Sequence, residues 1–251
     1  LKNVELATAL ADTEHHRQVA EQASQLKTEL LSIAAHDLKN PLAAIIGYIE
    51  LLLFQERADW PWRDIAQNIN ITGRQMLQII TDLLESATIS SGNLSLQLRP
   101  VDLGDLAWQV TERSRPQAEQ KGQALHFQAE SGCAVMADQL RIQEVVDNLV
   151  SNAIKYSPRA HPIWVSVARS GAWVRLSVKD AGPGLTAEDQ QRLFGRFTRL
   201  SAQPTGGEHA TGLGLSIVKR LVELHNGRVW AESAGAGEGS TFFVELLAAS
   251  N

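Results

Sequence analysis

The spacing of the apolar residues changes near residue 99, and this change limits the possible folds more than any other feature of the chain. Upstream, apolar residues recur at intervals of three and four, which is the period of a packed helix. Downstream, segments with the alternating pattern of strands are mixed with helical ones. We therefore expect an α+β protein with a helical domain over residues 1–98 and a mixed domain over residues 99–251, joined by a hinge at Arg99-Pro100.

Two antiparallel helices are predicted within the helical domain. A turn is expected around residues 55–61, and turn-forming residues at 90–93 end the second helix. A lone hairpin cannot cover its apolar stripes, so we expect a homodimer in which two hairpins form a four-helix bundle. The stripes are Leu42, Ile45, Ile49 and Leu52 on the first helix, and Ile65, Ile69, Thr72, Met76, Ile79 and Leu83 on the second. A coiled-coil seam is predicted upstream, at Val19, Ala23, Leu26, Leu30 and Ile33.

The second half is predicted to be an α/β sandwich with helices on one face of a sheet. Strands are expected at residues 125–130, 163–168, 173–178, 227–232 and 241–247. Helices are expected at residues 101–120, 139–156, 187–194 and 213–225.

Composition narrows the class of protein. The net charge of −5 argues against general nucleic-acid binding. The single cysteine, Cys133, excludes an internal disulfide and fits a reducing compartment. The most apolar stretch, residues 42–54, contains Glu50 and is too short to cross a bilayer. We expect a cytoplasmic fragment without direct membrane contact, from a longer protein that an upstream segment could anchor in a membrane.

The first chemical motif is His36-Asp37-Leu38-Lys39-Asn40-Pro41. A lone histidine on a helix is usually an ordinary surface or core residue. A neutral imidazole can attack phosphorus, however, when an acid such as Asp37 holds its second nitrogen. Neighbouring helix residues do not normally face each other, so this contact needs a particular rotamer. The motif resembles the H box of the HisKA-type histidine kinases. The resemblance implies that His36 is the phosphoacceptor, Asp37 its general base, and Asn40 a residue that positions water in a phosphatase reaction.

The second motif covers residues 147–156. Asn148 and Asn152 share a helix face with Lys155, and neutral oxygen donors beside a cation suit a magnesium–triphosphate. Helix-capping asparagines would be an equally good explanation of this segment alone. The segment resembles the N box of the same kinases. The resemblance implies that Asn148 and Asn152 bind Mg²⁺ and phosphate, that Lys155 contacts phosphate, and that Tyr156 packs on the base.

Two glycine-rich segments follow. Asp180-Ala181-Gly182-Pro183-Gly184 comes directly after a predicted strand and resembles the G1 box. The resemblance implies that Asp180 accepts a hydrogen bond from the adenine amino group and that Gly182 and Gly184 line the site. Thr211, Gly212, Leu213 and Gly214 open a predicted helix, where glycines and free N–H groups suit phosphate. They resemble the G2 box, apart from Ala210 in place of its first glycine, and the resemblance implies that all four bind nucleotide.

Two shorter segments complete the resemblance. Residues 194–199 resemble the F box, which implies that Phe197 packs under a lid and that Arg199 reaches toward the γ-phosphate. Residues 239–242 resemble the family's last motif, which implies that Thr241 reaches the adenine through water. These motifs stand in the family's order and spacing across residues 32–247.

The resemblance therefore implies a sensor histidine kinase of a two-component system with a Bergerat-type ATP-binding domain. ATP with Mg²⁺ would phosphorylate His36, and the acceptor would be an aspartate on a response-regulator receiver domain, which the enzyme could also dephosphorylate. One alternative is a gyrase-like or chaperone-like ATPase, which lacks the motif around His36. Another is a scaffold that holds nucleotide without transferring it, for which Ala210 is the only support.

Overall fold

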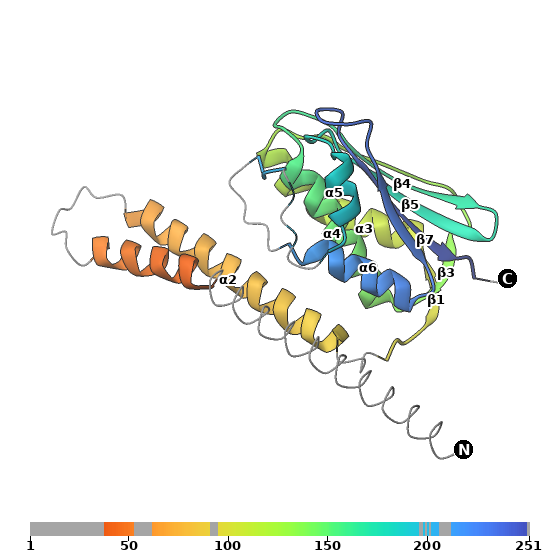
Figure 1. Ribbon diagram of the computed structural model, residues 1–251, viewed down its shortest axis with the longest axis horizontal. Coiled ribbons are helices and arrows are strands. Elements are labelled where there is room, and N and C mark those ends of the chain that lie inside the picture. The colour runs from red at the N-terminus through yellow and green to blue at the C-terminus, as the bar shows by residue number, and fades with distance from the viewer. Residues whose placement is uncertain are drawn as a thin grey trace, which may run out of the picture. The chain divides into compact units, whose positions relative to one another are not determined.

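The computed structural model describes residues 38–52, 62–90, 95–195, 198, 200, 202–205 and 212–249 (Figure 1). The chain divides into two compact units, Leu1–Thr81 and Asp82–Asn251, here called the helical unit and the α/β unit. The predicted boundary between residues 98 and 99 stays a prediction. Within the described ranges, no helix is both long and apolar enough to cross a membrane.

The helical unit contains a helix over residues 38–52 and most of α2 (Trp62–Ser90). Ile65 and Ile79 are buried on α2, with exposed fractions of 6% and 7%, while Ile69, Thr72 and Met76 are half-buried. These are five of the six residues of the stripe expected from the helical spacing, which confirms that part of the pattern; the side chain of the sixth, Leu83, lies outside the description. The predicted coiled-coil seam and the turn at residues 55–61 lie outside the described residues.

Many large apolar side chains of this unit remain exposed in the single chain. On the first helix the predicted stripe is only half covered, since Ile45 and Leu52 are half-buried while Leu42 and Ile49 are exposed. The exposed large apolar residues of the helical unit are Leu42, Ile46, Ile49, Leu51, Trp62, Ile71, Leu77 and Ile80.

A mixed five-stranded sheet forms the frame of the α/β unit. Its strand order is β2-β4-β5-β7-β6; β2 and β4 run parallel, and the other neighbours are antiparallel. The five predicted strands are all present, with ends that differ by at most two residues. Their bounds are β2 (Leu125–Ala129), β4 (Ile163–Ser170), β5 (Trp173–Lys179), β6 (Arg228–Glu232) and β7 (Thr241–Leu247).

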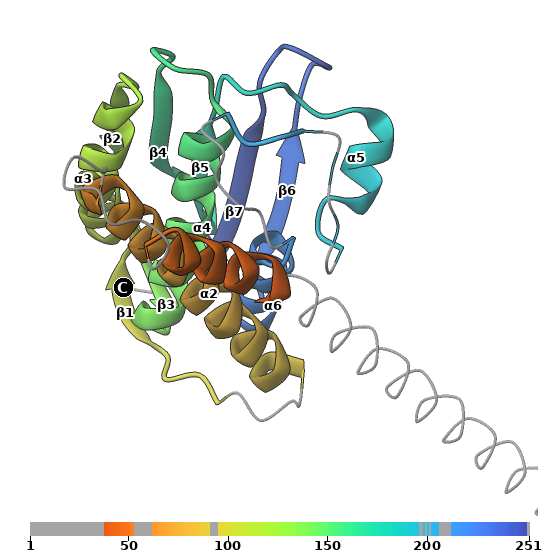
Figure 2. The ribbon, with the colours of Figure 1, turned by 90° about the vertical axis from the view of Figure 1, so that its left-hand side faces the viewer.

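Helices α3 (Leu103–Gln120), α4 (Gln139–Tyr156) and α6 (Gly214–Leu224) cover one face of this sheet (Figures 1 and 2). The strands alternate accordingly: Val174, Leu176 and Val178 of β5 are buried under the helices, while the residues between them are not. The short helix α5 (Ala187–Arg192) begins with a capping box formed by Thr186 and Asp189. This arrangement confirms the predicted α/β sandwich.

The outer face of the sheet, which no described helix of the α/β unit covers, carries aromatic rings beneath cations. The Arg175 guanidinium lies over the rings of Trp230 and Phe243, at 5.4 and 5.8 Å from their centroids. Lys179 lies 5.4 Å from the Trp164 ring. A further pair, Arg228 over Trp173, has a separation of 4.5 Å.

The expectation that Arg99-Pro100 forms a hinge is wrong, because these two residues form part of a strand. They belong to β1 (Arg99–Asp102), which pairs antiparallel with β3 (Ala134–Ala137) in a two-stranded sheet that the sequence pattern did not reveal. The helix expected from residue 101 begins at Leu103, because the Asp102 carboxylate caps it by accepting the Asp105 N–H. Four-residue strands, one of them containing a proline, are too short to show a period.

Candidate nucleotide site

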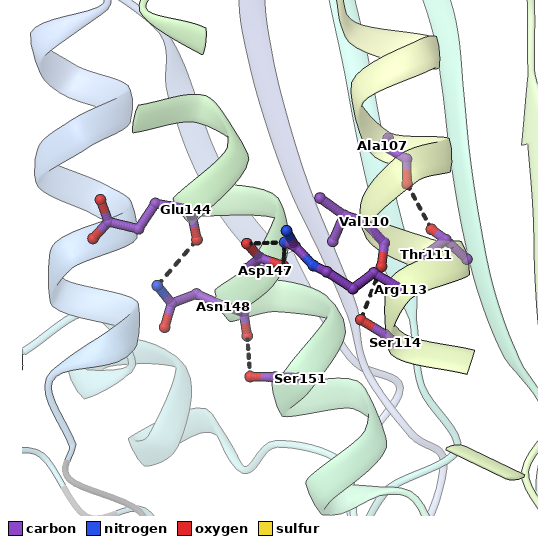
Figure 3. Close-up of polar contacts among 9 residues, drawn as sticks. All are labelled: Ala107, Val110, Thr111, Arg113, Ser114, Glu144, Asp147, Asn148 and Ser151. Atoms are coloured by element: carbon purple, nitrogen blue, oxygen red, sulfur yellow. Dashed lines mark hydrogen bonds and ion pairs between the residues drawn. The ribbon is translucent and has the colours of Figure 1, made fainter. Parts of the chain in front are cut away.

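Helix α4 presents Asn148 to the first residue of α6. The Asn148 Nδ2 donates to the Glu144 carbonyl at 3.1 Å, which turns Oδ1 outward. A Cβ added to Gly214 would lie only 2.6 Å from that Oδ1, so a side chain there would displace the amide. Figure 3 shows the Asn148 side chain pointing toward α6. The structure therefore brings the predicted N-box amide and the start of the G2-box helix into direct contact.

The acid next to Asn148 is held on the other side of α4. Both carboxylate oxygens of Asp147 accept hydrogen bonds from the Arg113 guanidinium of α3, each at 2.6 Å (Figure 3). Asn152 and Lys155 follow Asn148 at spacings of four and three, and both are half-buried. On a helix these spacings place the three side chains along one face, as predicted. An amide face without the Asp147 carboxylate suits a polyanion.

The Asp180 carboxyl is fixed by backbone donors just after β5. Its Oδ1 accepts the N–H of Gly182 at 2.8 Å and the N–H of Ser240 at 3.1 Å. Among the described residues, no hydrogen bond to Oδ2 is found, so this oxygen is available to a ligand donor. The residue is 5% exposed, and burial raises the pKa of the carboxyl more than the two backbone hydrogen bonds lower it.

Close backbone contacts hold the Asp180 loop in place. The Asp180 N–H donates to the Ser240 carbonyl at 2.9 Å, and the Ala181 N–H donates to the Ser157 hydroxyl at 3.2 Å. Gly184 and Gly239 have φ angles of +73° and +69°, and a Cβ on either would overlap a backbone oxygen. A Cβ on Gly182 would lie 3.1 Å from the Tyr156 carbonyl oxygen. The G1-box loop therefore packs on the end of the N-box helix.

Ser240, which the sequence interpretation did not select, is the hydroxyl residue beside Asp180. It is buried, and its N–H is one of the two donors to the carboxyl. Thr241 is the first residue of β7 and pairs with Lys179, so it lies on the outer face of the sheet, opposite the buried Phe242. The alternation of β7 was the signal: because Phe242 points into the core, Thr241 points away from it. The role predicted for Thr241 stays a prediction.

A buried lysine joins the end of α4 to a distant segment. The Lys121 ammonium donates to the carbonyls of Ile154 and Lys155 at 2.7 and 3.2 Å, and to the Thr205 hydroxyl at 2.7 Å. The Thr205 N–H also donates to the Lys155 carbonyl, at 2.9 Å. A cation at the last carbonyls of a helix is favourable. Lys155 and Tyr156 are therefore presented from a helix end that is fixed on several sides.

The remaining predicted site residues divide into two groups. Gly212, with a φ of +69°, and the buried Leu213 lead into α6, whose first-turn N–H groups suit an anion. Asn40 is exposed on the helix over residues 38–52. His36, Asp37, Phe197, Arg199 and Thr211 lie outside the described residues.

The donor set tests whether magnesium fits. Among the described residues, no group of three or more His, Cys, Asp or Glu side chains could hold a metal ion. Magnesium takes oxygen ligands and is often bound through few protein groups plus substrate phosphates. The outward Oδ1 of Asn148 and the amide of Asn152 are such groups, and they stand beside the anion-binding start of α6, so the residues fit a magnesium ion that arrives with a triphosphate.

Two family models match the chain. Residues 26–92 match the His Kinase A (phospho-acceptor) domain, and this range includes His36. Residues 137–250 match the histidine kinase-, DNA gyrase B- and HSP90-like ATPase family. Because the first match covers the segment around His36, a gyrase-like or chaperone-like ATPase is excluded as the better description.

Individual relatives agree with these matches. The circadian input-output histidine kinase CikA of Synechococcus elongatus is 33% identical over 90% of this chain, which spans 30% of that protein. Histidine kinase ThkA, solved in complex with the response regulator protein TrrA, has a TM-score of 0.71 and 25% identity over 95% of this chain and 66% of that one. Full-length ShkA in complex with AMPPNP has a TM-score of 0.65 and 28% identity over 89% of this chain and 47% of that one.

The chain spans between 27% and 44% of the lengths of five curated relatives that it matches. The two matched domains are a phospho-acceptor domain followed by an ATPase domain. The chain belongs to the histidine kinases, as a catalytic core of the HisKA type.

Proposed function

We propose that this chain binds ATP with Mg²⁺, transfers the γ-phosphoryl group to His36, and passes it to an aspartate of a response-regulator receiver domain. The observation that carries the proposal is the site around Asp180. A buried carboxyl with one oxygen fixed and the other available lies beside the end of a helix whose amide face meets a helix N-terminus.

The adenine end of the proposed site selects its base by hydrogen-bond polarity. Oδ1 of Asp180 is occupied by two N–H donors, so Oδ2 is left to accept from a ligand. Adenine offers an amino donor at the corresponding position, whereas guanine offers a carbonyl acceptor. A buried carboxylate opposite a carbonyl would leave both acceptors unsatisfied, which is costly. Tyr156, at the end of α4, would pack on the base.

The phosphate end would be held by α4 and α6. Asn148 and Asn152 would hold Mg²⁺, Lys155 would contact phosphate, and the N–H groups at the start of α6 would bind phosphate oxygens. When bound, magnesium would neutralise the charge on the triphosphate. The protein's part in phosphoryl transfer is then mostly positioning and charge stabilisation.

At the acceptor end, a ring nitrogen of His36 would attack the γ-phosphorus while ADP leaves. Asp37 would accept a hydrogen bond from the other ring nitrogen and hold the imidazole in its attacking orientation. The match of residues 26–92 to the phospho-acceptor domain supports this assignment. The cytoplasmic location of this part of the chain stays a prediction.

Two partners belong to the proposal. A receiver domain is supported by the ThkA structure, which contains the response regulator protein TrrA. A second copy of this chain is supported by the exposed apolar side chains of the helical unit, which a four-helix bundle would cover. Asn40, which is exposed and follows His36 by four residues in the sequence, would orient the water that removes phosphate from the regulator in the phosphatase reaction.

The test is incubation of the chain with ATP labelled at the γ-phosphate, followed by acid and alkali treatment. We expect label that is lost in acid, kept in alkali, and passed to a purified receiver domain. His36→Ala should abolish the label while nucleotide affinity stays within a few-fold of wild type, because His36 is remote in sequence from the nucleotide motifs. Acid-labile label on the His36→Ala chain would contradict the assignment.

A further inference from the structure

His225 is a buried histidine that the proposed reaction does not use. It caps the C-terminus of α6 and is 6% exposed. Its Nδ1 lies 2.7 Å from the Leu221 carbonyl oxygen, one turn earlier in the same helix. Its Nε2 lies 3.1 Å from the peptide nitrogen of Asp138, which is the N-cap residue of α4. One ring therefore joins the last turn of α6 to the first residue of α4.

The two partners fix the tautomer of this imidazole. A carbonyl oxygen can only accept a hydrogen bond, so Nδ1 carries the proton. A peptide N–H can only donate, so Nε2 must offer its lone pair. This assignment follows from the hydrogen-bond network and requires a neutral ring with the proton on Nδ1.

The bond to Asp138 stands opposite the nucleotide contact between the same two helices. Gly214 at the start of α6 touches Asn148 in α4, and His225 at the end of α6 meets Asp138 at the start of α4, so the helices run antiparallel. At about 1.5 Å per residue, the stretches between the two contacts are each about 15–17 Å long. They match in length, so α6 is held against α4 at both ends.

Asp138 also accepts a hydrogen bond from the segment that leads into β1. Its Oδ2 accepts the Gln97 N–H at 3.0 Å, while its Oδ1 accepts the N–H groups of Leu140 and Arg141. The Arg99 guanidinium donates to the neighbouring Gln139 side chain at 2.8 Å. The residue that His225 contacts is thus the junction of the incoming segment and the N-box helix.

We propose that His225 is a positioning residue that sets the axial position of α6 against α4. By doing so it sets the distance between the phosphate-binding start of α6 and the amides of Asn148 and Asn152. The inference rests on the proposed function, since it names those groups as ligands of the magnesium–triphosphate. Apolar helix contacts resist separation but not small axial shifts, whereas a directional hydrogen bond to a backbone N–H resists such shifts. The competing explanation is that His225 only caps the Leu221 carbonyl.

A matched pair of substitutions separates the two explanations. An asparagine can place its amide N–H near the position of Nδ1 and keep the bond to Leu221, but it is too short to reach Asp138. A glutamine can place its Oε1 near the position of Nε2 and accept the Asp138 N–H. His225→Asn thus keeps the cap and loses the bond between helices, whereas His225→Gln restores that bond.

The experiment uses the full chain and measures three quantities: the affinities for MgATP and for metal-free ADP, the rate of phosphohistidine formation, and hydrogen exchange at the Asp138 amide. In His225→Asn, we expect MgATP affinity and the phosphorylation rate to fall about tenfold, since the bond that holds the start of α6 at its distance from Asn148 and Asn152 is lost. Metal-free ADP affinity should fall by less than about threefold, because the adenine contacts remain. Exchange at Asp138 should become faster, and His225→Gln should resemble wild type in every quantity.

Each other result contradicts the inference. Equal losses in both variants would mean that the ring acts by shape or by capping, and unchanged MgATP affinity with faster exchange would mean that the bond does not position α6. If His225→Asn does not unfold cooperatively, the tautomer of His225 in the wild-type chain provides the test. A nitrogen NMR spectrum that places the proton on Nε2 would rule out the bond to Asp138. If the wild-type chain neither binds MgATP nor phosphorylates itself, the proposed function fails, while the tautomer and the protection of the Asp138 amide still test the geometry.

Discussion

The two units solve the problem of burying apolar surface in different ways. The α/β unit encloses a continuous core between its sheet and helices, with Ile142, Leu149 and Leu176 almost fully buried. In the described part of the helical unit, Ile65 and Ile79 are the buried hydrophobic residues of α2, while Leu77 and seven other large apolar residues remain exposed. The α/β unit therefore encloses its core within one chain, whereas the helical unit exposes apolar surface that a second copy, as proposed, would cover.

Buried polar groups sharpen the contrast. The α/β unit buries Lys121, Asp180 and His225, each with a hydrogen-bond partner on a distant segment of the chain. Unpaired, such groups would destabilise the fold, whereas paired ones fix the relative positions of elements. The helical unit needs no such fixing if its role is to present one histidine. In the proposed function, the α/β unit would hold the Asp180 loop, the end of α4 and the start of α6 around one ligand.

The largest expected effect is a loss of nucleotide affinity, and it tests the buried polar site of the α/β unit. Asp180→Asn keeps the two backbone bonds to Oδ1 but puts an N–H donor where Oδ2 was, facing the adenine amino donor. MgATP affinity should fall about 100-fold, since two opposed donors leave both groups unsatisfied. Calorimetric titration measures this loss, and unchanged affinity would remove Asp180 from the adenine site.

The same substitution should stabilise the ligand-free chain. Because burial raises the pKa of Asp180, the folded chain binds that proton more tightly than the unfolded chain does. The carboxyl's contribution to stability is therefore greatest below its ordinary pKa and is lost as pH rises through the raised folded-state pKa. Asparagine resembles the protonated form at every pH. The Tm of Asp180→Asn should exceed that of wild type by roughly 2–4 °C at neutral pH, and the difference should shrink in acid.

An intermediate effect is expected on dimerisation, and it compares an exposed leucine of the helical unit with a matched leucine of the α/β unit. Leu77 and Leu140 are both helical leucines, with exposed fractions of 64% and 67%. If Leu77 packs against a second copy, Leu77→Lys should weaken dimerisation by at least about tenfold, whereas Leu140→Lys should not change it. Sedimentation equilibrium measures both. Equal dimer affinities for the two variants would mean that Leu77 lies outside the dimer interface.

The smallest expected effect concerns the lysine at the end of α4. Lys121→Met keeps the length of the side chain but removes the ammonium that donates to the Ile154 and Lys155 carbonyls and to the Thr205 hydroxyl. The Gln123 amide and the Thr205 N–H still donate to those two carbonyls. The free energy of unfolding of the α/β unit should fall by about 1–3 kcal/mol. Lys219→Met, which removes only an exposed pair with Glu223, should cost less than about 0.5 kcal/mol. Equal costs in denaturant titrations would mean that Lys121 contributes no more than a surface charge.

The sequence predicted those parts of the molecule that local patterns specify. Helix α4 was predicted to the residue, because Asp138 is a strong N-cap and the helical period is clear up to Tyr156. The five strands of the main sheet were also predicted, because the apolar residues in several of them alternate. Strands β1 and β3 were not, since four residues show no period and the pairing joins distant segments.

The site was predictable as a set of motifs but not as a geometry. The contacts of Lys121 with Thr205 and of Asp138 with His225 join residues that are 84 and 87 positions apart, and no local sequence pattern predicts them. Ser240 was missed although the evidence was at hand, because the alternation of β7 places Thr241 on the opposite face. Spacing identifies residue types for chemistry, whereas tertiary packing decides which of two neighbours points inward.

The outer face of the main sheet has a consequence for solubility. Trp164, Trp230 and Phe243 would together form an adhesive patch, but the side chains of Arg175 and Lys179 lie over these rings and keep their charges in water. Arg175 is itself oriented by Glu245, at 2.7 Å. The cations above the aromatic rings thus discourage one sheet from stacking on another at high protein concentration.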